Sequence, residues 1–140
     1  MSDGEALSSF VRTKSSPASR TVLVVEDARD VRELFSVVLQ DAGYRVESAE
    51  SVEEALGVLR KGRGVDVIVA DYKLADGTGA ELIHQASNEG HLDVTATATL
   101  MCTAYGYVEL PPHVSMLRKP VDPTQLLLAV ERALGQRHVA

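Results

Sequence analysis

Short apolar runs that alternate with helical patterns constrain the fold of this chain most. The run Thr21–Val25 is rich in β-branched residues and has no polar alternation, which is typical of a strand buried on both faces. A second buried run spans 65–70. Further strand-like segments lie at 45–49, 97–102 and 114–117. These segments predict five strands, at least two of them in the interior of a sheet.

In most of the intervals between these runs, apolar residues recur at the spacing of a helix. Apolar residues recur at helical spacing over 31–39, and Gly43 can end this helix. Ser51 is expected to cap a helix over 52–60, and Glu54 is expected to complete a capping box. Two more helices are expected, one over 80–86 and a last one with Asp122 as its cap and Pro123 in its first position.

The order of these elements predicts an α/β fold. Strands that alternate with helices form a parallel sheet with right-handed crossovers. Five strands match the flavodoxin-like doubly wound sheet with strand order 2-1-3-4-5. The 15 residues between Thr103 and Lys119 include Gly106, Pro111 and Pro112, which oppose a helix. The fourth helix of this fold is therefore expected to be short or missing.

The length and composition suit one domain of an ordinary globular protein. Of the 140 residues, we expect 1–20 to form a flexible N-terminal tail, 21–135 the domain, and 136–140 a short C-terminal tail. We therefore expect a stand-alone domain with no attached output domain. The net charge of -6 disfavours direct binding to nucleic acid or to an anionic membrane.

Two further features bear on the compartment. Cys102 is the single cysteine, so no intramolecular disulfide can form, which fits a reducing interior. No apolar run approaches the roughly 18 residues that a membrane span needs. We expect a cytoplasmic protein without membrane insertion.

Polar and charged residues stand where the predicted strands end. Glu26 and Asp27 follow the first strand, Asp71 the third, Thr103 the fourth and Lys119 the fifth. Ligands of such sheets bind at the carboxyl ends of the strands, so we expect these side chains at one rim. Crowded carboxylates repel one another, and Mg²⁺ would relieve this repulsion. An Asp beside such a metal can attack phosphorus and form an aspartyl phosphate, with Lys119 neutralising charge and Thr103 donating a hydrogen bond.

The same residues make the chain similar to the receiver domain of two-component response regulators. The motifs are Leu-Val-Val-Glu-Asp at 23–27, Asp-Tyr-Lys-Leu-Ala-Asp-Gly-Thr-Gly at 71–79, and Lys119-Pro120. The resemblance covers about residues 21–134. It implies a histidine kinase or a histidine phosphotransfer protein as the phosphoryl donor, and an output protein that the sequence does not identify. It also implies roles for single residues: Asp71 as the phosphoacceptor, Glu26, Asp27, Asp71 and the Lys73 backbone carbonyl as Mg²⁺ ligands, Lys119 as the partner of the phosphoryl group, and Thr103 as the switch hydroxyl.

The chain departs from the family pattern at two places. The fourth helix, whose surface usually takes part in partner binding and dimerisation, is expected to be short or missing. Met116 stands where the family normally carries an aromatic residue, three positions before Lys119. The family's coupled movement of threonine and aromatic therefore cannot work unchanged, and Tyr105 or Tyr107 would have to substitute.

Several functions remain open at this point. The first is a stand-alone, non-enzymatic receiver that signals by phosphorylation-dependent partner binding or by phosphorelay. The second is a receiver-like adaptor that binds partners without phosphorylation. The third is a Mg²⁺-dependent phosphatase that forms an aspartyl phosphate, which Lys73 disfavours because a second catalytic Asp would be needed there. A flavin-binding electron carrier is disfavoured by Glu26 and Asp27, which would repel its phosphate.

Overall fold

The computed structural model describes residues 19–104, 109–111 and 113–139. Its first half contains the strands β1 (Thr21–Val25), β2 (Arg45–Ala49) and β3 (Val67–Asp71) and the helices α2 (Arg29–Asp41) and α3 (Val52–Arg60). Its second half contains the short strands β4 (Lys73–Leu74) and β5 (Gly77–Thr78), the helix α4 (Gly79–Asn88), the strands β6 (Ala98–Thr103) and β7 (Val114–Arg118), and the helix α5 (Pro123–Val139).

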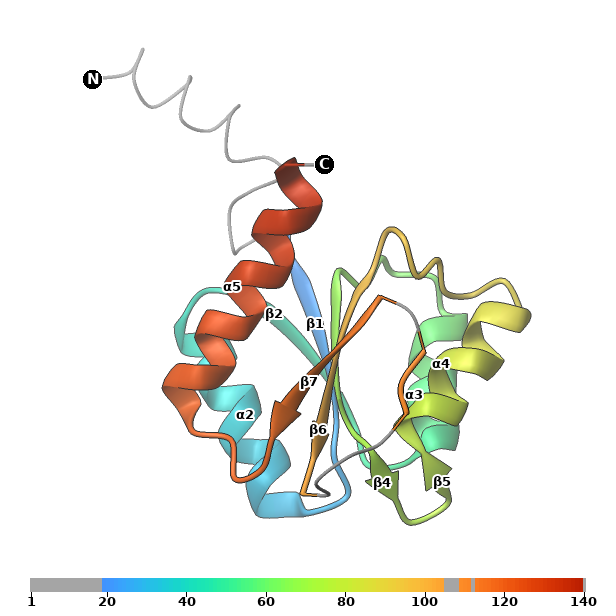
Figure 1. Cartoon of the computed structure of the whole chain (residues 1–140), viewed down its shortest axis with the longest axis horizontal. Helices are drawn as coiled ribbons and strands as arrows, with labels where there is room; N and C mark the ends of the chain where they lie inside the picture. Colours follow the sequence, from blue (N-terminus) through green and yellow to red (C-terminus); the bar gives the residue numbers. More distant parts are fainter. Residues whose placement is uncertain (1–18, 105–108, 112, 140) are drawn as a thin grey trace.

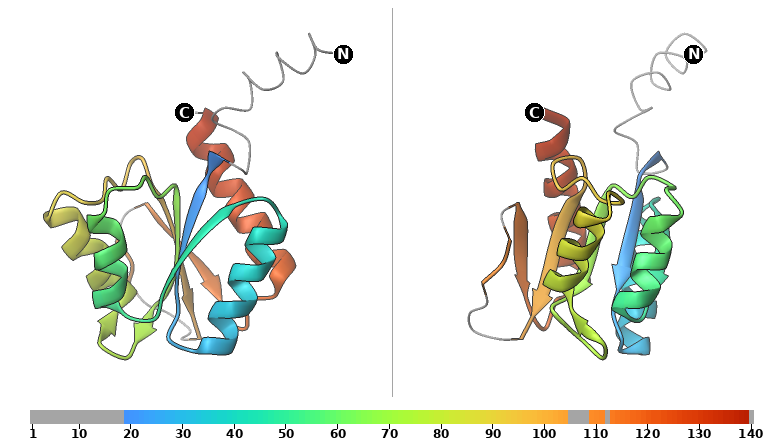
Figure 2. Two further views of the ribbon diagram at one scale, coloured as in Figure 1. Left: turned by 180° about the vertical axis from the view of Figure 1, so that it is seen from behind. Right: turned by 90° about the vertical axis from the view of Figure 1, so that its right-hand side faces the viewer.

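The main sheet has the predicted topology. Its strand order is β2-β1-β3-β6-β7, and every neighbouring pair is parallel. With β6 and β7 as the fourth and fifth strands, this is the doubly wound order 2-1-3-4-5, so the predicted fold class is confirmed. Helices α2 and α5 cover one face of the sheet, and α3 and α4 cover the other (Figures 1 and 2). None of the helices in the described part of the chain combines the length and apolar character that crossing a membrane requires.

Both faces of the central strands are buried, which explains their continuous apolar sequences. Along β1, Leu23 and Val25 pack into the cluster under α3 and α4, whereas Val22 and Val24 pack into the cluster under α2 and α5. The first cluster also contains Leu56, Ile68, Leu82, Ile83 and Met101, and the second contains Phe35, Leu39, Val69, Leu126 and Val130. The two apolar layers fix the helices against the sheet and hold its carboxyl edge in place.

The start of α3 confirms the predicted Ser51 cap, but the predicted capping box with Glu54 is wrong. The Ser51 hydroxyl accepts a hydrogen bond from the Glu54 N–H at 3.0 Å, as expected of a cap. The Glu54 carboxylate, however, accepts from the Glu50 N–H at 3.1 Å, so the expected reciprocal box is shifted by one residue. A complete capping box occurs instead at α4, between Thr78 and Glu81, where none is predicted above.

The last helix begins as predicted and extends further than expected. The Asp122 carboxylate accepts from the backbone N–H groups of Thr124 and Gln125 at 2.6 and 3.3 Å. The Gln125 side chain in turn accepts from the Asp122 N–H at 3.1 Å. The helix continues to Val139, so the segment expected as a C-terminal tail from Gln136 is helical for most of its length.

The start of the described chain is attached to the sheet. The Arg20 carbonyl accepts from the Arg45 N–H at 3.0 Å, and the Arg20 guanidinium lies 3.5 Å from the Asp66 carboxylate. The remainder of the predicted tail, residues 1–18, lies outside the described residues.

Strand β3 ends one residue later than predicted, since Asp71 is its last residue.

The connection between β6 and β7 contains no helix among its described residues, 104, 109–111 and 113. These described residues agree with the prediction of a short or missing fourth helix, and Pro111 among them opposes a helix. Met116 lies in β7 opposite Met101 of β6 and is 42% exposed. The two tyrosines considered as substitutes for the family aromatic, Tyr105 and Tyr107, lie outside the described residues.

Candidate functional site

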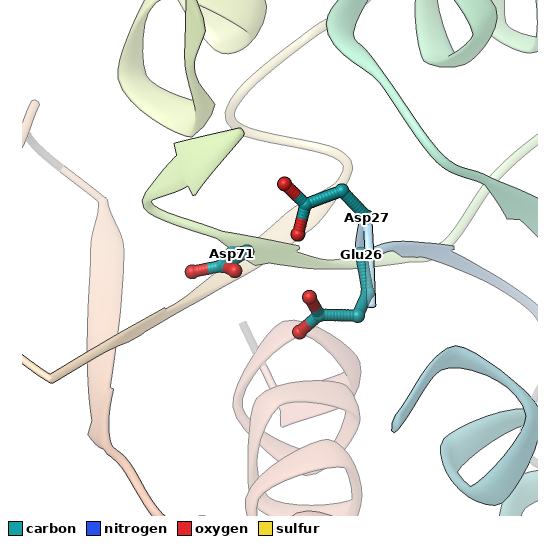
Figure 3. A group of neighbouring side chains, drawn as sticks. All are labelled: Glu26, Asp27 and Asp71. Carbon is teal, nitrogen blue, oxygen red and sulfur yellow. The ribbon is translucent and has the colours of Figure 1, made fainter. Parts of the chain in front are cut away.

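Three carboxylates meet at the carboxyl edge of the sheet. One oxygen from each of Glu26, Asp27 and Asp71 lies within 4.8 Å of the other two. Glu26 and Asp27 directly follow β1 and Asp71 ends β3, and because these two parallel strands are hydrogen-bonded neighbours, their ends coincide. Figure 3 shows the side chains of Glu26 and Asp27 extending from the end of β1 toward the side on which Asp71 lies. Glu26 and Asp71 are buried and Asp27 is exposed, so the cluster opens to solvent at Asp27.

Lys119 brings a positive charge to this cluster. Its ammonium lies 2.9 Å from Asp71 Oδ2 and 3.5 Å from Glu26 Oε1. The Lys119 N–H also donates to the Thr103 carbonyl at 2.8 Å, which ties the end of β7 to the end of β6. Burial alone would lower the pKa of Lys119, but the hydrogen bond and charge of Asp71 and the charge of Glu26 outweigh it and raise the pKa. Lys119 is therefore an ammonium at neutral pH.

The buried carboxyl of Glu26 is difficult to ionise. Burial raises the pKa of Glu26 to about 7, and the negative charge of Asp71 acts in the same direction against the hydrogen bond from the Ala28 N–H. Near neutral pH the cluster thus lacks enough positive charge to stabilise all of its carboxylates. A hard divalent cation supplies such charge and prefers carboxylate oxygens, so the residues present suit Mg²⁺.

The turn after β1 holds Glu26 in place through backbone contacts. The Ala28 N–H donates to Glu26 Oε2 at 3.0 Å, and Arg32 Nη1 donates to the Glu26 carbonyl at 2.8 Å. The second nitrogen of the Arg32 guanidinium lies 3.9 Å from the Glu50 carboxylate, beyond the end of β2. Arg32 was not identified from the sequence, because an arginine on an amphipathic helix gives no signal that separates it from solvent-exposed ones.

The hairpin of β4 and β5 follows Asp71 directly. The Lys73 N–H lies 3.4 Å from Asp71 Oδ1, and the Gly79 N–H donates to the Tyr72 carbonyl at 2.7 Å. A Cβ atom at Gly79 would lie 2.7 Å from the Asp71 carbonyl oxygen and would also clash with Met101 Sδ. Glycine at position 79 therefore allows α4 to begin directly against the strand that carries Asp71.

Thr103 completes the set of residues expected at this edge. It is the last residue of β6, it is only 1% exposed, and its strand neighbours β3, which carries Asp71. The fold thus delivers Glu26, Asp27, Asp71, Thr103 and Lys119 to the same end of the sheet. The roles of Thr103 and of the Lys73 carbonyl stay predictions.

A cavity of about 380 Å³ lies beside Lys119. Its walls come from the first half of α2 and from the chain that follows β7, and they include Val31, Leu34, Phe35, Pro120 and Val121. Leu34, one of these wall residues, is 47% exposed, so its side chain presents apolar surface to solvent next to the cavity. The candidate site therefore has an apolar surface at its border.

Comparisons with known proteins agree with the features of this site. The family model described as the response regulator receiver domain matches residues 22–131. A response regulator receiver protein of Anaeromyxobacter sp. (strain Fw109-5) is 32% identical over 110 residues, which is 77% of this chain and 46% of that protein. The response regulator protein PilR of Pseudomonas aeruginosa is 32% identical over 122 residues, 83% of this chain and 26% of PilR. The chain thus spans less than half the length of these two relatives.

Solved structures show the same architecture. A CheY-like response regulator receiver domain protein from Methanospirillum hungatei superimposes with a TM-score of 0.76 at 25% identity, and the alignment covers 86% of this chain and 97% of that chain. The chemotaxis response regulator CheY4 of Vibrio cholerae superimposes with a TM-score of 0.70 at 32% identity, covering 81% of this chain and 98% of that chain.

Proposed function

The chain belongs to the receiver domain family of response regulators, and from this premise we propose that Asp71 accepts a phosphoryl group from a phosphohistidine donor in a Mg²⁺-dependent reaction. Receiver domains are signalling modules, for which phosphorylation is the general expectation. The observation that carries the proposal for this chain is the meeting of Asp71 with Glu26, Asp27 and Lys119 at one edge of the sheet.

The proposed transfer needs a nucleophile and positive charge around it. An oxygen of the Asp71 carboxylate attacks phosphorus, a P–O bond forms, and the P–N bond to the donor imidazole breaks. The imidazole leaves with its electron pair and takes up a proton, and Asp71 becomes an acyl phosphate. We propose that Lys119 balances the new negative charge, and the contact of its ammonium with Asp71 Oδ2 at 2.9 Å supports this role.

The metal would be held by residues of this chain. We assign its ligands to the carboxylates of Glu26, Asp27 and Asp71 and to the backbone carbonyl of Lys73. When bound, Mg²⁺ supplies positive charge to the oxygens of the transferred phosphoryl group. The buried, hard-to-ionise carboxyl of Glu26 supports this assignment, because a cation at this place favours its charged form.

Phosphorylation would change the charge at the edge of the sheet. An acyl phosphate on Asp71 adds roughly -1 to -2 charges at neutral pH, by analogy with other phosphorylated side chains. We propose that the Thr103 hydroxyl donates to a phosphoryl oxygen and that partners recognise the resulting state, either as an output protein or as the next member of a phosphorelay. Met116 in place of an aromatic residue implies that the readout differs from the usual one of the family.

The apolar cavity beside Lys119 suits the docking of the donor. A phosphohistidine can reach Asp71 only if its protein docks close to the site. The surface around Leu34 and Pro120 provides apolar contact area close to Asp71. Lys119 links the two places, because it lines the cavity and also contacts Asp71. We therefore propose that a histidine kinase or a histidine phosphotransfer protein docks there.

The proposal is tested with a small phosphodonor. The folded protein is incubated with Mg²⁺ and acetyl phosphate, and its intact mass is measured. We expect one added phosphoryl group that alkali removes, and none in the near-isosteric Asp71→Asn variant or when the metal is chelated. Equal modification of the variant would place the site elsewhere. A folded protein that binds Mg²⁺ and stays unmodified would favour the phosphorylation-independent adaptor, and sustained release of phosphate from small esters would favour the phosphatase.

A further inference from the structure

Asp76 connects the hairpin after the proposed phosphorylation site to a distant helix. Its Oδ1 accepts from the Val52 N–H at 2.9 Å, and its Oδ2 accepts from the Glu53 N–H at 3.1 Å. Asp76 lies in the turn between β4 and β5, whereas Val52 and Glu53 are the first two residues of α3. Two hydrogen bonds thus join segments that are more than twenty residues apart in the sequence.

These contacts complete the start of α3. The first N–H groups of a helix lack partners within the helix, and a negative charge there is favourable. Ser51 accepts from the third of them, that of Glu54, and Asp76 accepts from the first two. The backbone hydrogen bonds from Val52 and Glu53 lower the pKa of Asp76, so its carboxylate is charged at neutral pH. Asp76 therefore holds the tip of the hairpin against α3.

The base of the hairpin is held separately. The Gly79 N–H donates to the Tyr72 carbonyl at 2.7 Å, and the capping box of Thr78 and Glu81 fixes the passage from β5 into α4. Lys73, whose carbonyl we assign to the metal, stands in β4 between this base and the tip. The contacts of Asp76 hold the tip, and those of the base hold the strands that lead to it.

We propose that Asp76 is a positioning residue for Mg²⁺: it tethers the hairpin to α3, fixes the backbone at Lys73, and couples metal binding to the first turn of α3. The inference rests on the proposed function, since it needs the Mg²⁺ site. Coupling of this kind is reciprocal, so a tether that strengthens Mg²⁺ binding also makes Mg²⁺ strengthen the tether. Two measurements on the full chain follow from this.

The first measurement is the affinity for Mg²⁺, determined by calorimetric titration without any phosphodonor. In Asp76→Ala we expect the affinity to fall about tenfold, as for other residues that orient metal ligands. Asp76→Asn keeps an acceptor oxygen for one of the two N–H groups and should lose less. The matched control is Ser51→Ala, which removes from the same helix end a cap whose hydrogen bond, to the Glu54 N–H, stays within α3. We expect Ser51→Ala to lose less affinity than Asp76→Ala, because the tether from the hairpin to α3 remains, and an equal loss in both variants would overturn the proposal.

The second measurement is amide hydrogen exchange with and without Mg²⁺. In the wild type we expect Mg²⁺ to slow exchange at Val52 and Glu53 severalfold, and in Asp76→Asn we expect a smaller effect. The N–H groups of Thr124 and Gln125, which Asp122 caps at the start of α5 on the other face of the sheet, serve as the internal control and should not change. If the exchange rates at Val52 and Glu53 in the wild type are the same with and without Mg²⁺, the proposed coupling is wrong.

The outcomes separate this inference from the proposed function. A wild-type protein that binds Mg²⁺ and is phosphorylated on Asp71, together with an Asp76→Asn and an Asp76→Ala variant of unchanged affinity, refutes the role of Asp76 alone. A folded wild-type protein that binds no Mg²⁺ refutes both. Circular dichroism of each variant establishes folding, and Asp76→Asn carries the test if Asp76→Ala unfolds.

Discussion

The Lys119 ammonium lies 2.9 Å from Asp71 Oδ2, although 48 positions separate the two residues in the sequence. The contact occupies an oxygen of the carboxylate that we propose as the phosphoacceptor. Lys119 also reaches Glu26, at 3.5 Å, so one cation serves two buried carboxylates. When a phosphoryl group is added to Asp71, Lys119 can keep its position and neutralise the new oxygens.

Replacement of Lys119 by methionine should slow phosphorylation of Asp71. Removing a preorganised charge that stabilises a transition state commonly costs about 10² to 10³ in rate, so we expect at least about a hundredfold slower reaction with acetyl phosphate. Intact mass followed over time measures the rate. Mg²⁺ should bind at least as tightly as in the wild type, because a competing positive charge is gone.

Lys73→Met provides the control for this experiment. Lys73 is also a lysine and stands two residues after Asp71, but its side chain is exposed and only its backbone carbonyl is assigned a role. We expect its phosphorylation rate to stay within about twofold of the wild type, a difference of roughly 0.4 kcal/mol. A Lys119→Met variant that reacts as fast as Lys73→Met would contradict the role of Lys119.

Gly79→Ala should destabilise the fold, because its Cβ atom would lie 2.7 Å from the Asp71 carbonyl oxygen and would also clash with Met101 Sδ. The methionine can move, but the carbonyl belongs to a central strand, so we expect a loss of about 1–3 kcal/mol in the free energy of unfolding. Urea denaturation measures this loss. Gly57→Ala in α3 is the matched control, since a Cβ there meets nothing within 4 Å.

The Gly57→Ala variant should be more stable than the wild type. Alanine is favoured over glycine in a helix by up to about 1 kcal/mol, and the structure leaves room for the methyl group. Equal stability of the two variants would show that α4 can move away from β3 at no cost, contrary to the close approach described above.

Cys102 should resist alkylation in the native protein. Its side chain is 2% exposed, and burial raises the pKa of the thiol to about 12, so almost no reactive thiolate forms at pH 8. We expect iodoacetamide to leave the folded protein unmodified over hours and to modify it once in urea. The intact mass distinguishes the unmodified protein from the protein that carries one alkyl group. Rapid modification without denaturant would mean that β6 opens readily at its carboxyl end.

Sequence patterns predicted the sheet and its edge well because both depend on local signals. Continuous β-branched runs identify buried strands, and charged residues directly after them must lie at the carboxyl edge once the sheet is parallel. This reasoning correctly brought Glu26, Asp27, Asp71 and Lys119 together. Asp122 was likewise identified as a cap, because its partners Thr124 and Gln125 are close neighbours in the sequence.

Contacts between distant segments were not predictable in the same way. Asp76 and Gly77 read as a turn, but nothing in the sequence indicates that the Asp76 carboxylate binds the start of α3. The two-residue strands β4 and β5 are too short to produce an apolar alternation. Arg32 is half-buried because its guanidinium reaches the Glu26 carbonyl, a contact that depends on the tertiary structure of the turn after β1. These features arise from tertiary packing, so the local propensities of the residues do not predict them.

A substitution of Leu34 should separate protein donors from small phosphodonors. Leu34 is 47% exposed on α2 and lines the cavity beside Lys119, where we propose that the donor docks. In Leu34→Arg we expect transfer from a phosphorylated histidine kinase or phosphotransfer protein to fall about tenfold or more, which corresponds to the loss of one apolar anchor of an interface. Phosphorylation by acetyl phosphate should not change, because the reacting groups are untouched.

The control for Leu34→Arg lies on the same helix. Val37 is 52% exposed and does not line the cavity, so Val37→Arg adds the same charge to α2 away from the proposed docking surface. Donors are taken from the histidine kinases of the source organism, and the fastest donor for the wild type is used with both variants. A Val37→Arg variant that loses transfer as strongly as Leu34→Arg would move the docking surface along α2. Unchanged transfer in Leu34→Arg would show that the donor approaches Asp71 from another side, because a buried arginine at the centre of an apolar contact cannot be neutral.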